Sequence, residues 1–327
     1  MIEQVVKREY VEKVIANEKI KMEDMEIKEL FYDSIFKGVF SKQENVLLKF
    51  IKILLDIKER YDNPVSIIGY ELPISKKKGK INRGDILLKL SDNSYINIEM
   101  NKGRDSRILK RNIVQVSRIY GNLRKSGKKE SELEDLKVKQ LNLNNFRNVT
   151  GKPIEHILLC EKELGEIISD LISLCNIDIE MCYRMVYNKG IRNVSKAVRI
   201  GAMLLAKSLK ELSYILGDDI LSMEEKEKFL EYVKEVNEDE KIIQDWMAEE
   251  NAEMKEEGLL IAAREDGHAE GLVKGHAEGL AEGHVEGSLS KELEVIKNML
   301  KEKLDYNVIS KVTGKSISEI KEIENNM

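Results

Sequence analysis

The chain has 327 residues, of which 42% are apolar and 35% charged, with a formal net charge of −5. This composition suits a folded, helix-rich chain and argues against a disordered one. No stretch of about 18 uncharged apolar residues is present, and the first residues lack the apolar core of a signal peptide. The three cysteines have no metal-site spacing, so we expect reduced thiols, a cytoplasmic location and no membrane partner.

The charge is spread unevenly along the chain. Residues 70–130 hold 16 Lys and Arg against 6 Asp and Glu, although the whole chain is acidic. A basic zone of this kind is typical of a surface that contacts nucleic acid, and it is also typical of a solvated loop face. The sequence therefore keeps nucleic-acid contact as one of two interpretations.

Helices are predicted at the start of the chain. Residues 1–29 read as a helical lead, and a helical segment starts over Leu30–Phe40. In Asn45–Asp56 the apolar residues recur at helical spacing, which predicts a helix that packs on a sheet.

Strands follow from residue 65 onward. The β-branched run Val65–Glu71 predicts a first strand, and Asp85–Leu90 and Ser94–Met100 alternate with a period of two around the turn residues Ser-Asp-Asn. Two more strands are predicted over Val138–Phe146 and Ile154–Glu161, giving a sheet of about five strands.

The two central strands suggest a metal site. Because the start of one strand of a hairpin lies opposite the end of the other, we expect Asp85 and Glu99 to lie side by side. Two close carboxylates repel each other unless a cation lies between them, and hard oxygen ligands favour Mg²⁺ or Mn²⁺. Glu99 and Asn101 share a face, whereas Lys102 points away from it in a regular strand.

A helix is predicted over Gly103–Lys125. Its residues Arg107, Arg111 and Gln115 recur every four positions and so lie on one face. They are candidates for phosphate contact, and a solvated basic face is the alternative.

Helices are also predicted for the rest of the chain. Gly165–Gly217 reads as covering helices, and Met223–Trp246 as an acidic amphipathic helix that the single Trp anchors to the core. From Gly267 to Gly287 a glycine recurs every four residues, which predicts either a marginal helical linker or a smooth seam for another helix. The last segment reads as two short helices around Gly314, with Ser316 and Glu319 in capping-box spacing. Their acidic surface favours a capping or dimerising hairpin over a DNA-binding helix–turn–helix.

Several of these motifs together resemble the PD-(D/E)xK nuclease family transposases, also described as Rpn-like recombination-promoting nucleases. Asp85 followed by Glu99-Met100-Asn101 resembles the Asp…(Asp/Glu)-x-Lys core. The segment Asp33–Phe40 resembles an N-terminal D-x-x-F-K-x-x-F motif, and Lys110-Arg111 falls where the family has an arginine-containing helix. The glycine-punctuated tail is similar to the tails of those proteins.

The resemblance implies an α/β, restriction-endonuclease-like mixed sheet flanked by helices, with a helical C-terminal extension. It implies metal-dependent hydrolysis of DNA, linked to transposition or recombination, with Asp85, Glu99 and the Met100 carbonyl holding the metal. The superfamily usually has Lys where this chain has Asn101, which can orient water but carries no charge. The remaining expected site residues are DNA contacts and supporting acids: Arg83, Lys102, Arg107, Arg111 and Gln115 for DNA, and Asp33 or Glu44 beside the metal.

Alternatives remain open for individual residues and for the whole chain. Asp33 also fits a helix N-cap and Glu44 a solvated residue. The chain as a whole also fits a nuclease-fold module without activity that binds nucleic acid or protein, or a regulator that acts through its C-terminal hairpin. We expect five segments, with an oligomer formed through the C-terminal helices: residues 1–29, 30–216, 217–257, 258–289 and 290–327.

Overall fold

The structure is a computed structural model that describes residues 6–17, 24–57, 66–69, 86–90, 94–103, 107–124 and 136–327. It has two compact units, Met1–Glu250 and Asn251–Met327. No helix in the described ranges combines the length and the apolar character needed to cross a membrane. The finer division into five segments stays a prediction.

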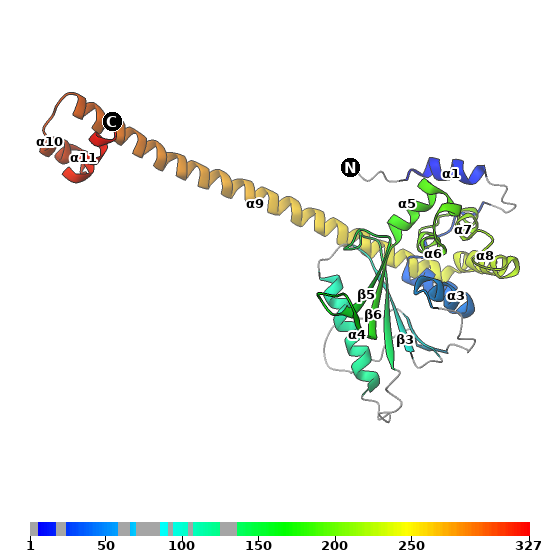
Figure 1. Ribbon diagram of the computed structural model, residues 1–327. Coiled ribbons are helices and arrows are strands. Elements are labelled where there is room, and N and C mark those ends of the chain that lie inside the picture. Colours follow the sequence, from blue (N-terminus) through cyan, green and yellow to red (C-terminus); the bar gives the residue numbers. More distant parts are fainter. Residues whose placement is uncertain are drawn as a thin grey trace. The chain divides into compact units, whose positions relative to one another are not determined.

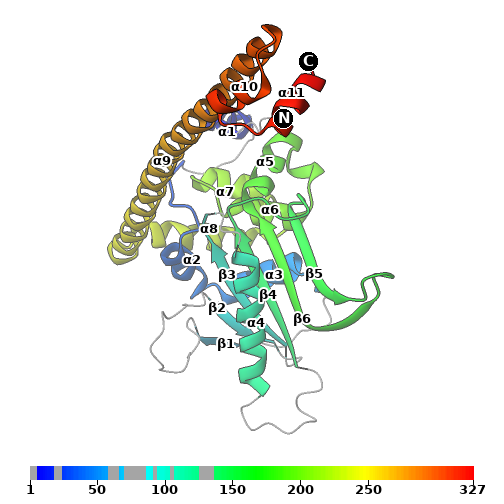
Figure 2. The same cartoon turned by 90° about the vertical axis from the view of Figure 1, so that its left-hand side faces the viewer.

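A six-stranded mixed sheet lies at the centre of the first unit (Figures 1 and 2). The strand order is β1-β2-β3-β4-β6-β5. The three inner strands β3, β4 and β6 run parallel, and the other pairs are antiparallel. The strands are β1 (Ser66–Gly69), β2 (Ile86–Lys89), β3 (Ser94–Asn101), β4 (Lys137–Asn144), β5 (Ile154–Cys160) and β6 (Ile167–Asp178).

Helices cover both faces of this sheet. On one face, α4 (Ile108–Arg124) packs Val116 and Ile119 against Tyr95, Val138 and Leu174. Figure 2 shows α4 lying along the strands. The other face carries the larger core, which is built mainly from six helices. These are α2 (Asp33–Phe40), α3 (Glu44–Leu54), α5 (Ile179–Lys189), α6 (Lys196–Met203), α7 (Leu209–Leu216) and α8 (Met223–Glu238).

The N-terminal lead contains α1 (Arg8–Ala16), whose Val11 and Ile15 are buried. A short 3-10 turn, η2 (Ile191–Asn193), links α5 to α6. The fold class expected from the sequence is thus confirmed: a mixed sheet flanked by helices and followed by a helical extension.

One predicted helix is wrong. The segment from Ile167 onward was expected to be helical, because its apolar residues recur in adjacent pairs four apart. The structure makes it β6, an inner strand, in which Cys175 and Ile177 face the large core while Leu174 faces α4. In the second half of β6 the side chains alternate between the two faces of the sheet, as in a strand. The first half does not show this alternation, because the neighbouring residues Ile167 and Ile168 are both apolar and exposed.

The predicted acidic helix over Met223–Trp246 is two helices. It breaks at Asp239, which has extended backbone angles after the end of α8. The next helix, α9 (Glu240–Lys301), contains Trp246. Trp246 is 8% exposed and meets the Tyr32 ring edge to face at 5.8 Å, so it does anchor this region to the core.

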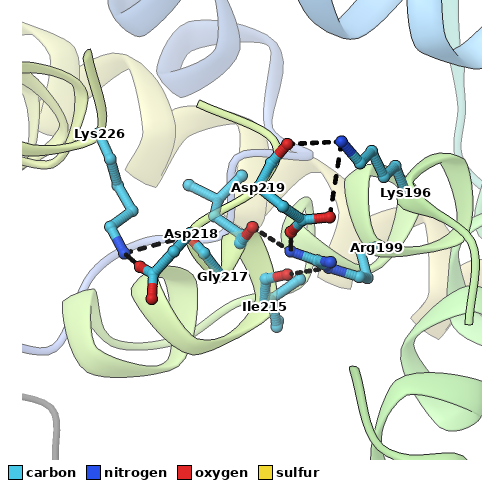
Figure 3. A network of polar contacts seen from close by, with 8 residues as sticks. Lys196, Arg199, Ile215, Gly217, Asp218, Asp219 and Lys226 are labelled. Atoms are coloured by element: carbon cyan, nitrogen blue, oxygen red, sulfur yellow. Dashed lines mark hydrogen bonds and ion pairs between the residues drawn. The ribbon is translucent and has the colours of Figure 1, made fainter. Parts of the chain in front are cut away.

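Figure 3 shows how a buried arginine holds the turn after α7. Arg199 on α6 donates its Nε to the carbonyl oxygen of Ile215 at 2.8 Å and also bonds the carbonyl oxygen of Leu216. Its guanidinium pairs with Asp219 at 2.7 Å. These contacts satisfy the last carbonyl groups of α7, which have no partner within the helix.

The second unit contains the glycine repeat and a small helical cap. The repeat belongs to α9, where, apart from the helix's own backbone, no atom lies within 4 Å of a Cβ added at Gly267 or Gly287 or at the four repeat glycines between them. After α9, α10 (Tyr306–Thr313) ends at Gly314 with φ +72°, and α11 (Ile317–Asn325) begins with the expected capping box of Ser316 and Glu319. The core of this cap consists of Ile296, Ile309 and Ile320.

Candidate metal and nucleic-acid site

The site lies on the face of β3 that α4 covers. Ile96 and Ile98 point into the large core, so Asn97, Glu99 and Asn101 point to the opposite side. In the parallel register with β4, Glu99 lies opposite Asn142 and Asn101 opposite Asn144. The carboxyl ends of the three parallel strands therefore meet at one edge, where open α/β sheets bind their ligands.

Glu99 is an acid held in a mostly dry place. Glu99 is 8% exposed, and the Nε2 of Gln115 on α4 donates a hydrogen bond to the Glu99 Oε2 at 2.9 Å. Burial raises the pKa of the Glu99 carboxyl above its usual range. The hydrogen bond from Gln115 and the positive charge of Arg111 oppose that rise, and the negative charge of Asp33 adds to it.

Asp33 is a second acid whose negative charge acts on Glu99. It is the first residue of α2, and Tyr32 occupies the N-cap position. Its Oδ2 pairs with Lys37 at 2.8 Å, while its Oδ1 is buried without a hydrogen-bond partner among the described residues. A buried, unsatisfied carboxylate oxygen beside a second acid is an arrangement that a divalent cation would stabilise.

The described residues do not by themselves complete a metal site. They contain no group of three His, Cys, Asp or Glu side chains placed to hold an ion. Asp85, the predicted partner of Glu99, lies outside the described residues, and so does Arg83. The described neighbours are Ile86 and Ile98, which pair directly across the antiparallel β2–β3 hairpin. Of the predicted acids, Glu99 and Asp33 are therefore the described candidates for a cation ligand.

Asn101 is fixed from both sides. It is 1% exposed, its Nδ2 donates to Asn144 Oδ1 at 2.9 Å, and its Oδ1 accepts from Arg111 Nη2 at 2.7 Å. Arg111 is an exposed residue of α4. Its guanidinium contacts the end of β3 through this bond.

A second row of buried amides crosses the same sheet, and the sequence analysis did not predict it. Asn97 donates to Gln140, which donates to Asn142, which donates to Asn176 at 2.8 Å, and Asn176 donates to Glu155. On α4, Asn112 also donates to Asn142. The signal was the alternation of Gln140, Asn142 and Asn144 in the predicted strand, since polar residues at every second position share a face.

The other predicted residues lie in different settings. Gln115 is buried and hydrogen-bonded to Glu99, so its position favours a role in holding the Glu99 carboxylate. Lys102 lies 3.8 Å from Glu249 and 3.9 Å from the centre of the Tyr32 ring. Met100 is half-buried in β3, and Arg107 is exposed just before α4. Glu44 is exposed at the start of α3 and makes no hydrogen bond or ion pair to the described part of the site.

Glu249, near the start of α9, binds the N-terminal end of α2. Its carboxylate accepts from the backbone N–H groups of Asp33 at 3.0 Å and of Ser34 at 2.9 Å. Free N–H groups at a helix start favour an anion, so Glu249 stabilises this end of α2. The contact with Lys102 links the same carboxylate to the end of β3.

Comparison with known proteins gives a family match. Searches among curated proteins and among solved structures give no match. The family model described as PD-(D/E)XK nuclease family transposase matches residues 30–258, which include the sheet, α2 and α4. Since this is most of the chain and includes every described site residue, the protein belongs to the PD-(D/E)XK nuclease family transposases, a family with a nuclease-related role that acts on DNA.

Proposed function

We propose that this protein is a metal-dependent DNA endonuclease that hydrolyses phosphodiester bonds in transposition or recombination. The observation that carries the proposal is the buried acid Glu99 near the carboxyl end of the parallel strands, inside the region that matches the nuclease family. The unsatisfied oxygen of Asp33 supports a cation at this place.

Asp85, Glu99 and the Met100 carbonyl are the proposed metal ligands, with Asp33 as the supporting acid. Bound Mg²⁺ or Mn²⁺ would supply an activated water and neutralise charge on the scissile phosphate. The chain itself would orient these groups: Gln115 holds Glu99 through the bond at 2.9 Å, and α4 excludes water from one side of it. Glu44, which is exposed and has no bond to the described part of the site, is the weaker candidate for support.

DNA contact is proposed along the start of α4 and the end of β3. Arg107 and Arg111 are exposed there, and Lys102 and Arg83 are the further candidates from the sequence. Charged side chains of this kind position the phosphate backbone without reading the sequence. We therefore expect affinity to fall steeply with salt.

The first test measures nicking of supercoiled plasmid DNA with Mg²⁺ or Mn²⁺. Asp85→Ala and Glu99→Gln should abolish nicking, because each removes a metal ligand, while circular dichroism stays unchanged. Glu227→Gln, an exposed acid on α8, is the matched control and should cut like the unaltered chain. Nicking that survives in Asp85→Ala would reject the assignment.

A second candidate function is a nuclease-fold module without activity. Asn101 stands where the superfamily has a lysine, and both ends of its amide are engaged by protein groups, which favours this alternative. Calorimetry separates the two: heat of binding at millimolar Mg²⁺ or Mn²⁺ supports the enzyme, and its absence supports the module. An oligomer formed through the C-terminal helices stays a prediction that sedimentation can test.

A further inference from the structure

A nuclease centre of this type needs a positive charge beside the scissile phosphate, and Asn101 cannot supply one. The nearest described cation in the hydrogen-bond network is Arg111, whose Nη2 lies 2.7 Å from Asn101 Oδ1. Its charge also acts on Glu99. Asn101 on β3 and Arg111 on α4 therefore form one hydrogen-bonded unit at the site.

We infer that Arg111 supplies the catalytic positive charge and that Asn101 is the residue that positions it. The inference rests on the proposed function and gives the site its missing charged group. Arg111 would contact a non-bridging oxygen of the scissile phosphate and stabilise the charge that grows there as water attacks. A guanidinium suits this role because it stays charged and has five N–H donors in a planar fork.

The path of contacts behind Asn101 explains how the guanidinium is aimed. Asn101 is held by Asn144, whose Nδ2 reaches Asn148 Oδ1 at 3.4 Å. Asn148 is 5% exposed and donates to the backbone carbonyl oxygens of Lys152 and Asn176 at 3.0 and 3.1 Å. Because these amides are buried and anchored to backbone, the Asn101 oxygen is a fixed acceptor. One guanidinium N–H docks Arg111 on Asn101, which leaves its other donors for a phosphate oxygen.

Arg111 differs in this respect from Arg118, another arginine of α4. Arg118 lies two turns further along α4, is also exposed, and has no hydrogen bond or ion pair to the described residues of the site. Both arginines add one positive charge to a DNA-facing helix, but only Arg111 is docked on the sheet. Arg118→Gln is therefore the matched control for Arg111→Gln.

The test separates the rate of the chemical step from DNA affinity. Single-turnover cleavage of a DNA duplex is measured with the full chain in excess and Mg²⁺ or Mn²⁺, and affinity for the same duplex is measured with Ca²⁺. Arg111→Gln should slow cleavage on the order of 100-fold with affinity changed less than about threefold, which is the range for loss of one transition-state donor. Arg118→Gln should leave the cleavage rate unchanged.

Asn101 has its own readout. Asn101→Ala should slow cleavage to a similar extent as Arg111→Gln, and the double variant should be no slower than either single variant, because the two residues act as one unit. Asn101→Gln, which keeps the amide oxygen, should recover part of the rate. Millimolar guanidinium should restore cleavage by an Arg111→Ala variant.

The outcomes separate this inference from the proposed function. If the unaltered chain cuts DNA and Arg111→Gln cuts at the same saturated rate, the role of Arg111 is overturned and the nuclease assignment stands. Equal loss of affinity in Arg111→Gln and Arg118→Gln, with unchanged cleavage rates, would overturn it as well. If the unaltered chain does not cut with either metal, the proposed function fails and the catalytic role of Arg111 fails with it.

Discussion

Glu99 is the described residue whose ionisation most opposes folding at the site. Burial raises its pKa, so the folded state binds a proton more readily than the unfolded chain does. The protonated carboxyl contributes its full stabilisation of the folded state below the pKa of Glu in the unfolded chain, which is about 4.3. It is lost as the pH rises through the folded pKa, because the carboxylate must then ionise inside the protein.

The first prediction at this scale concerns Glu99→Gln in metal-free buffer with a chelator. The amide stays neutral, so the variant should gain stability relative to the unaltered chain as the pH rises from 4 to 8. Denaturant unfolding at several pH values measures the difference. Glu227→Gln is the control, and its difference from the unaltered chain should not follow the same rise. A difference for Glu99→Gln that is flat over this range would contradict the environment described for Glu99.

The sequence predicts which residues share a face of β3, but it does not predict the contacts that those residues make with α4. The period of two placed Glu99 and Asn101 on one side, and the structure agrees. The bonds from Gln115 to Glu99 and from Arg111 to Asn101 depend on how α4 is rotated above β3. That rotation follows from packing of Val116 and Ile119 on the sheet, which involves residues far apart in the chain.

Among the elements, the end of α7 shows how a helix terminus depends on another helix. Gly217 has φ +59°, in the left-handed region that side chains with a Cβ rarely adopt. A Cβ added there would collide with Arg199 Nη2, the group that bonds the last carbonyl of α7. Lys226 also donates to the Gly217 carbonyl oxygen at 3.0 Å.

We therefore expect Gly217→Ala to destabilise the first unit by roughly 1–3 kcal/mol, from backbone strain and from the displaced arginine. Thermal and denaturant unfolding measure the loss. Gly121→Ala is the matched control, since Gly121 lies inside α4 with nothing within 4 Å of an added Cβ. It should be neutral or stabilising by up to about 1 kcal/mol. Equal effects of the two substitutions would show that Arg199 does not hold this turn.

The same scale explains which elements the sequence predicts. Amphipathic helices such as α3 and α10 have apolar residues at helical spacing, and their positions follow from that spacing. The strand β6 does not, because its exposed first half carries apolar residues on both faces. The break between α8 and α9 was also missed, since Asp239 sits between two segments with the same acidic, helical pattern.

Across the whole molecule, the two units differ strongly in their cores. The first unit has buried side chains on both faces of a six-stranded sheet. The cap at the end of the second unit has Ile296, Ile309 and Ile320 as its fully buried core, with Tyr306 and Met299 at its edge. A core of this size supplies little stabilisation, so the cap should unfold separately from the first unit.

Ile309→Asp tests this separation. Ile309 is 0% exposed, and an ionised carboxylate there would have no partner, which should unfold α10 and α11. Hydrogen exchange should show lost protection in residues 306–325, while calorimetry shows the first unit melting at its usual temperature. Val308→Asp is the matched control, because Val308 is 47% exposed and should tolerate the charge. A lowered melting temperature of the first unit in Ile309→Asp alone would instead mean that the two units stabilise each other. The same variant bears on function: unchanged DNA affinity would exclude α10 and α11 as a DNA-binding helix–turn–helix, and reduced affinity would revive that role.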